Sequence, residues 1–261
     1  IILGWQAGNN LTTTDNSIMI GYRAGYVDRG TNDHDIIIGY EAGLKVTGGS
    51  NVGIGRDALR GTGGSEFAAV STAAENTAVG YGAASTIIGS QISAFGYQAG
   101  GAATGSRGVY VGYRAGRGAT SAPYGSGLYN TAIGYEALED FTTGLNNVAV
   151  GYQAGSDLTS GGGSVFVGKL AGANITTTDN NTVVGYSALE LATTAASNTV
   201  IGSGTMYAVP AGVALSGCVA IGSNALRGVN ITTAANYTVA IGVGALQMNT
   251  SGAGNLAVGY N

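Results

Sequence analysis

The chain has 261 residues, including 48 Gly, 15 Tyr and only 2 Pro, with 44% hydrophobic residues and a net charge of −4. Abundant Gly without Pro or a strict Gly-X-Y triplet excludes collagen, and the apolar content is too high for a disordered chain. The 10 Lys and Arg residues are scattered, which argues against a nucleic-acid partner. No apolar run approaches the length of a membrane span, so we expect no membrane insertion of this segment.

A nine-residue phrase, typified by residues 147–155, recurs along the whole chain. We call the glycine at the fifth position of each copy, equivalent to Gly151, the anchor glycine. The commonest spacing between successive anchor glycines is 17 residues. Such a fixed period predicts a repeat architecture. The anchor glycines are Gly4, Gly21, Gly39, Gly55, Gly80, Gly96, Gly112, Gly134, Gly151, Gly168, Gly185, Gly202, Gly222, Gly242 and Gly259.

A short strand is predicted immediately before every anchor glycine. The residue preceding the glycine is apolar in all fifteen copies, and two residues earlier stands Val, Ile, Leu, Thr or Ser, often with Ala between them. This period-2 alternation in β-branched residues predicts a strand with one buried face. The anchor glycine itself is expected to provide a bend or a positive φ.

Three further positions repeat around the strand. Ala stands three residues after the glycine in thirteen of the fourteen complete copies, which predicts a close approach of two backbones. An aromatic residue follows the glycine in ten copies, and Asn stands four residues before it in seven. The tyrosines expected to form a ladder are Tyr22, Tyr40, Tyr81, Tyr97, Tyr113, Tyr135, Tyr152 and Tyr186. The asparagines expected to form a corner ladder, hydrogen-bonded between copies, are Asn51, Asn76, Asn130, Asn147, Asn181, Asn198 and Asn255.

Such short strands need to be stacked in parallel, at about 4.8 Å per repeat, to be stable. The predicted fold is therefore all-β: a parallel β-solenoid or β-roll of about 15 rungs of roughly 17 residues, which would form a rod of roughly 65–70 Å. Residues 1–261 are expected to be one continuous array without an internal domain boundary. Because the chain opens and closes inside a repeat, we expect it to be a piece of a longer fibre protein.

The strand motif resembles the head repeat of the YadA-like trimeric adhesins, as in Asn-Thr-Ala-Val-Gly at 76–80 and Asn-Leu-Ala-Val-Gly at 255–259. Versions with Gly-Tyr-x-Ala-Gly or Gly-Tyr-x-Ala-Leu are similar to repeats of bacteriophage tail-fibre proteins. The resemblance covers the whole chain and implies a left-handed roll, a homotrimer and a place outside the cell. The chain departs from the bacterial heads in its longer loops and its Tyr after Gly.

Candidates for chemistry are few. The only histidine, His34, lies between Asp33 and Asp35, a set that offers at best part of a metal site. Cys218 is the only cysteine and occupies a corner position. The glycine-rich strings lack the Lys and the strand–loop–helix context of a phosphate loop. We therefore predict no enzyme, no metal and no cofactor.

The ladders are the remaining binding candidates. Exposed tyrosines would stack on sugars, but a packed ladder or a seam between chains is the preferred interpretation. Threonine clusters resemble those of ice-binding solenoids, although their uneven spacing disfavours a flat face. The clusters are Thr12 to Thr14, Thr142–Thr143, Thr176 to Thr178 and Thr232–Thr233.

The preferred function is a structural fibre segment, the shaft or head of a phage tail fibre or similar virion appendage that supports host attachment. Its partners would be two further copies of itself and a host-surface receptor such as a glycan. A cell-surface trimeric adhesin or extracellular filament is the first alternative. A secreted glycan- or ice-binding solenoid is the second.

Overall fold

A computed structural model describes residues 1–11, 16–26, 34–61, 71–120, 125–228 and 231–261. The chain forms two compact units, Ile1–Asn130 and Thr131–Asn261. Both are parallel β-solenoids, as predicted from the repeat. The expected continuity of one array over residues 1–261 stays a prediction.

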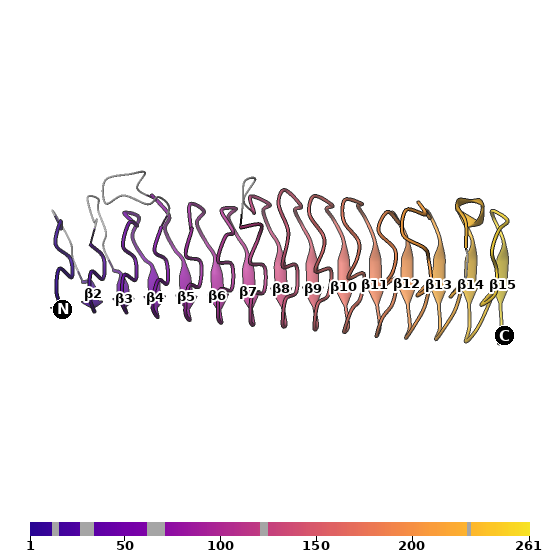
Figure 1. The fold of residues 1–261 in the computed structure, drawn as a ribbon, viewed down its shortest axis with the longest axis horizontal. Coiled ribbons are helices and arrows are strands. Elements are labelled where there is room, and N and C mark those ends of the chain that lie inside the picture. Colours follow the sequence, from indigo (N-terminus) through magenta and orange to yellow (C-terminus); the bar gives the residue numbers. More distant parts are fainter. Residues whose placement is uncertain (12–15, 27–33, 62–70, 121–124, 229–230) are drawn as a thin grey trace. The chain divides into compact units, whose positions relative to one another are not determined.

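The first unit contains seven described strands, each hydrogen-bonded in parallel to the next one in chain order (Figure 1). The register brings equivalent repeat positions together, for example Ile36 against Val52. The strands are β1 (Ile2–Leu3), β2 (Ile18–Ile20), β3 (Ile36–Ile38), β4 (Val52–Ile54), β5 (Thr77–Val79), β6 (Ser93–Phe95) and β7 (Val109–Val111).

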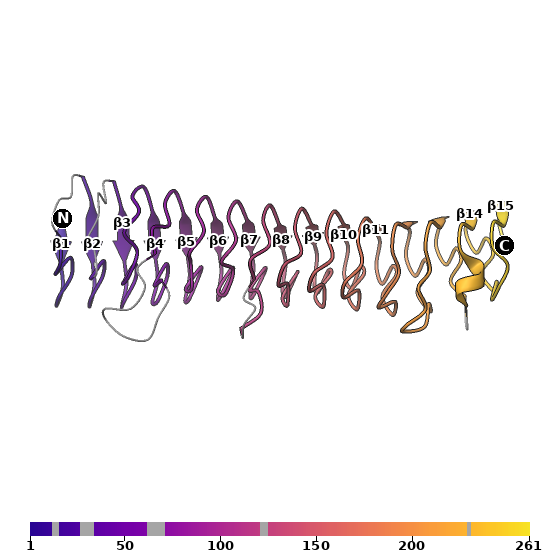
Figure 2. The same ribbon diagram turned by 90° about the horizontal axis from the view of Figure 1, so that it is seen from above.

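The described part of the second unit contains eight strands with the same parallel, in-order pairing. A single 3-10 turn, η1 (Thr233–Ala235), lies in the loop before β14 and is visible near the yellow end of the ribbon in Figure 2. The strands are β8 (Thr131–Ile133), β9 (Val148–Val150), β10 (Val165–Val167), β11 (Thr182–Val184), β12 (Thr199–Ile201), β13 (Val219–Ile221), β14 (Val239–Ile241) and β15 (Leu256–Val258).

In the three-residue strands, β2 to β15, the middle residue faces the core, and we call this the inner position. Ala149, Phe166 and Val183 in β9–β11 are all fully buried there. The residues before and after it, which we call the outer positions, are only partly covered. The strands thus have one buried face, as the alternation predicted, but most of their β-branched residues lie on the opposite, outer face. The inner positions hold residues of very different size, from Ala149 to the buried rings of Tyr110 and Phe166.

Each anchor glycine has a φ between +126° and +149°, and the expected bend is located there. A Cβ on Gly151 would lie 2.6 Å from the carbonyl oxygen of Gly168 in the next rung. The anchor glycines therefore stack backbone against backbone, with no space for a side chain. Ala154, three residues later, is fully buried and donates its N–H to the Gly151 carbonyl at 3.5 Å, closing a four-residue turn.

Two positions in this region, two and four residues after the anchor glycine, have the left-handed backbone conformation. Gln153 and Glu136, two residues after their anchors, have φ near +50°, and the third residue of a type II turn also has a positive φ. The residue four after the anchor, which we call the filler position, is also left-handed and is most often Gly or Leu. At this position Leu138 and Leu189 are fully buried. The turn is thus specified by backbone geometry that recurs in every rung.

Candidate functional site

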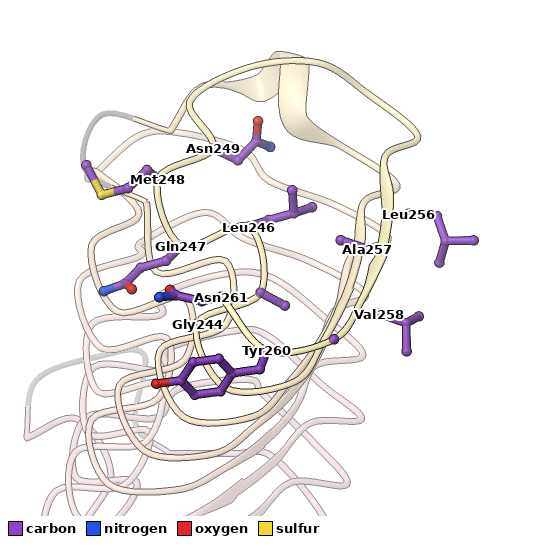
Figure 3. A pocket seen from close by; sticks show the side chains of 12 residues that line it. Gly244, Leu246, Gln247, Met248, Asn249, Leu256, Ala257, Val258, Tyr260 and Asn261 are labelled. Atoms are coloured by element: carbon purple, nitrogen blue, oxygen red, sulfur yellow. The ribbon is translucent and has the colours of Figure 1, made fainter.

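The outer positions form an apolar strip along the strands of each unit. None of them holds a charged residue. Figure 3 shows the arrangement at β15, where Leu256 and Val258 point away from the coil and Ala257 points into it. Ile133 and Ile201 are 39% and 37% exposed although each pairs with a residue of a neighbouring strand in the second unit, Val150 and Val184 respectively. Exposed apolar patches of this kind are typical of surfaces at which proteins associate.

The tyrosines after the anchor glycines form stacked ladders on the surface. Ring centroids are 4.9 Å apart for Tyr22 and Tyr40, and 5.1 Å apart for Tyr135 and Tyr152. In the first unit Tyr81, Tyr97 and Tyr113 continue with the same spacing. Most of the ladder rings keep about two fifths of their surface exposed. The ladder is therefore packed along the stack and open to its side.

Two cations replace rings within these ladders. Arg56 occupies the ring position between Tyr40 and Tyr81, with its guanidinium carbon 5.3 Å and 5.5 Å from their centroids. Lys169 does the same between Tyr152 and Tyr186, at 5.5 Å and 5.8 Å. A cation between two ring faces is stabilised by the quadrupoles of both. These residues maintain the stack where the aromatic residue is missing.

The second-unit ladder ends at Tyr186. The next two ring positions hold Ser203 and Ser223, and a hollow of about 370 Å³ opens beside Tyr186. Tyr186 is 54% exposed, more than any other of the eight predicted ladder tyrosines. The hollow is also lined by Glu190, Tyr207, Asn224 and Arg227. It combines an open aromatic face with one carboxylate, one amide and one guanidinium.

Six of the seven corner asparagines are buried inside the coil, and the hydrogen bonds of several of them connect rungs. Asn147 is fully buried; its Oδ1 accepts the Ser164 N–H at 3.0 Å and its Nδ2 donates to the Gly161 carbonyl at 2.9 Å. Asn76, Asn181 and Asn198 make equivalent bonds to the next corner or loop. Asn51 and Asn130 are also buried, and Asn255 donates to Gly252. These side chains hold the loop-to-strand corner.

The sequence reasoning did not identify the threonine column eight residues after the anchors. Thr142, Thr159 and Thr176 each donate the side-chain hydroxyl to a carbonyl in the next rung, at 2.9–3.1 Å. Thr47 does the same in the first unit. Counting from the anchor glycine, rather than looking for threonine clusters, would have found this column. The hydroxyl groups of this threonine column are thus hydrogen-bonded between rungs. Thr12 to Thr14 lie outside the described residues.

The residues considered for chemistry are dispersed. His34 is exposed, whereas Asp35 is a buried corner residue whose Oδ1 accepts the Asn51 N–H at 2.7 Å; Asp33 is outside the described residues. Within the described ranges no group of three His, Cys, Asp or Glu residues is placed to hold a metal ion. Burial raises the pKa of the Cys218 thiol, against the opposing effect of hydrogen bonds from the Thr238 and Tyr237 backbone. Cys218 lies at a buried corner, away from the hollow beside Tyr186.

The hollows elsewhere are simpler. One of about 720 Å³ lies against the last rung, where Leu246, Met248 and Tyr260 flank it (Figure 3). Another of about 370 Å³ in the first unit is lined by Arg114, Arg117 and small polar residues. Among the described residues, no helix has the length and apolar character required to cross a membrane. No protein-family model matches the chain, and neither a curated protein nor a solved structure shows significant similarity to it.

Proposed function

We propose that the chain is a non-enzymatic segment of an extracellular fibre, the shaft or head of a phage tail fibre or a similar virion appendage, which supports host attachment. In this role three copies associate through the apolar strip formed by the outer positions. The strip is the single observation that carries the proposal. The sequence resemblance to trimeric adhesin heads and tail-fibre repeats supports it in addition.

The chemistry of the strip favours another copy of the chain as its partner. The outer positions hold Ile, Val, Leu, Phe, Thr and Ser, without a charge that would require a counter-ion. Burying apolar surface is favourable by about 25 cal/mol per Å², so a strip that recurs in each rung gains with every rung added. β-branched side chains also lose little rotamer freedom on contact. A copy with the same rung spacing would meet the strip at each rung.

The rest of the rung suits a mechanical role. Backbone pairing, buried corner amides and stacked rings each connect one rung to the next. These connections recur along each unit, so resistance to bending and unfolding is distributed over many equivalent contacts. The loops between rungs vary in length without changing the strand and turn. Such loops are suited to secondary contacts with a host surface.

The proposal is tested by sedimentation equilibrium of the 261-residue chain over a hundredfold concentration range. The expected mass is three times the 25.7 kDa of one chain. A monomer at every concentration would overturn the proposal, and a stable dimer would overturn the trimer.

A double variant locates the interface. Ile133→Lys with Ile201→Lys places charges on β8 and β12, at two of the most exposed outer positions of the second unit. We expect the variant to sediment as a monomer while its β-sheet circular dichroism is retained. Ser160→Lys, at an exposed loop residue, is the matched control and is expected to keep the assembled mass. An assembled Lys double variant would place the interface elsewhere.

A further inference from the structure

We propose that the hollow beside Tyr186 binds one pyranose ring of a glycan, with the sugar stacked on the open face of Tyr186. The inference rests on the proposed attachment function and names the ligand class and the place of contact. Every residue that carries it lies in the second unit, and the hollow measures about 370 Å³. This volume is at the lower end of the range for small-molecule sites and fits a single ring.

The ladder geometry supplies the stacking platform. Where the ladder is complete, each ring is followed by another about 5 Å away, as Tyr135 is by Tyr152. Tyr186 has Lys169 over its ring at 5.8 Å, and this is its only ring or cation partner among the described residues. The next ring position holds Ser203, which is too short to cover the other face. A flat ligand placed there would continue the stack.

The polar lining matches hydroxyl groups. Glu190 provides a carboxylate that accepts hydrogen bonds, and Arg227 provides a guanidinium that donates them. Neither side chain makes a hydrogen bond or ion pair with another described residue, although Arg227 lies 5.6 Å over the Tyr207 ring. Asn224 adds an amide that both donates and accepts.

These groups favour a neutral sugar over an ion. The carboxylate and the guanidinium offset each other, so the hollow does not select a charged ligand by net charge. Neighbouring hydroxyls of a pyranose each donate and accept, and they present donors and acceptors within one ring width. The apolar C–H face of the same ring suits the tyrosine. The combination of one aromatic wall and convergent polar groups is typical of small-ligand sites.

The test is saturation-transfer NMR with four probes: methyl α-D-glucopyranoside, methyl β-D-galactopyranoside, methyl α-D-mannopyranoside and N-acetyl-D-glucosamine. We expect transfer to the ring protons of at least one probe, and at least tenfold weaker binding by Tyr186→Ala. Tyr152→Ala is the matched control, because Tyr152 holds the same ring position but is covered by Tyr135 and Lys169. The Tyr152→Ala variant should bind the sugar with the affinity of the wild-type chain.

A second variant tests whether the missing ring at Ser203 creates the sugar site. Ser203→Tyr places a ring where the ladder lacks one, so it should stack on Tyr186, keep the fold and abolish transfer to the sugar. The inference is overturned if the wild-type chain transfers to none of the four probes, if Ser203→Tyr binds as well as wild type, or if Tyr152→Ala and Tyr186→Ala lose binding equally. Assembled mass is measured on the same samples. An intact trimer without sugar transfer would overturn this site alone, whereas a sugar-binding monomer would overturn only the fibre assembly.

Discussion

Phe166 and Gly172 share one space in the core of the second unit. A Cβ on Gly172 would overlap Cδ1 and Cε1 of the Phe166 ring, and one on Gly155 would lie 2.8 Å from Cδ2. Where the inner position is small, as at Ala132, the filler position holds Leu138 instead. The same exchange pairs Met19 with Gly25 and Gly53 with Leu59. Inner and filler positions of one rung thus compete for the same core space, and a large ring such as Phe166 also fills space beside the filler glycine of the preceding rung, Gly155.

This complementarity predicts strong coupling between Phe166 and Gly172. Phe166→Ala alone should lower the free energy of unfolding by about 3–5 kcal/mol because it leaves a cavity. Gly172→Leu alone should also destabilise, since Leu and the ring overlap. In the double variant the Leu occupies the vacated space, at a φ (+57°) close to that of Leu138 (+47°). Urea unfolding should give a coupling energy of about 1–3 kcal/mol, and additive losses would contradict the exchange.

Asn147 tests the corner ladder. Asn147→Ala removes the partners of the buried Ser164 N–H and Gly161 carbonyl, and should cost roughly 2–5 kcal/mol in urea unfolding. Asn147→Ser keeps an acceptor for the next corner, as Ser164 does for Asn181 at 3.1 Å, and should lose about half as much. The neighbouring Asn146 is exposed with φ +59°, so Asn146→Gly is the control and should change little. Equal losses at the two positions would argue against the ladder.

Gly151 tests the anchor position. Gly151→Ala forces a side chain into φ +138° and against the Gly168 carbonyl, so we expect a loss of about 3–5 kcal/mol. Gly212 also has a positive φ (+80°), but an added Cβ would meet no atom within 4 Å. Gly212→Ala should therefore cost only the backbone strain, about 1–2 kcal/mol. Thermal or urea unfolding measures both, and a Gly151→Ala variant as stable as Gly212→Ala would refute the close approach.

The buried thiol of Cys218 should make the free energy of unfolding depend on pH in a defined direction. Its pKa is raised in the folded chain by burial, while the unfolded thiol has a pKa of about 8.5. Well below pH 8.5 the thiol is neutral in both states and its ionisation does not affect stability. Above it the unfolded thiol loses its proton first, so the free energy of unfolding should fall as the pH rises.

The measurement is urea unfolding from pH 7 to 9.5, compared between wild type and Cys218→Asn. Asn is the usual corner residue, so the variant should fold and should lose less stability across this range. Ionisation of Tyr110, whose pKa burial also raises, is shared by both proteins and cancels. A difference between the two proteins that does not change with pH would contradict the prediction. Native Cys218 should also react slowly with thiol reagents until the chain unfolds.

The positions of the rung were predictable because they recur. A glycine with φ near +135° and a carbonyl packed against it tolerates no other residue, so Gly151 and its equivalents are visible in the sequence alone. The competition between inner and filler positions was hidden because both vary: a large ring such as Phe166 stands with Gly172, whereas Ala132 stands with Leu138. A search for one residue type at each position does not detect such a pairing.

The amino-acid sequence by itself determined the period, the strand before each anchor glycine and the parallel stacking, because each repeat needs the same neighbour on both sides to pair its backbone. Only the tertiary structure decided which strand face is buried. Both faces of Val148–Ala149–Val150 are apolar, so hydrophobic alternation does not separate them. The turn after each anchor glycine contains residues with positive φ, and it decides which strand face turns inward. Ala149 lies inside, and Val148 and Val150 lie outside. The equivalent turn leaves the open face of Tyr186 beside Ser203.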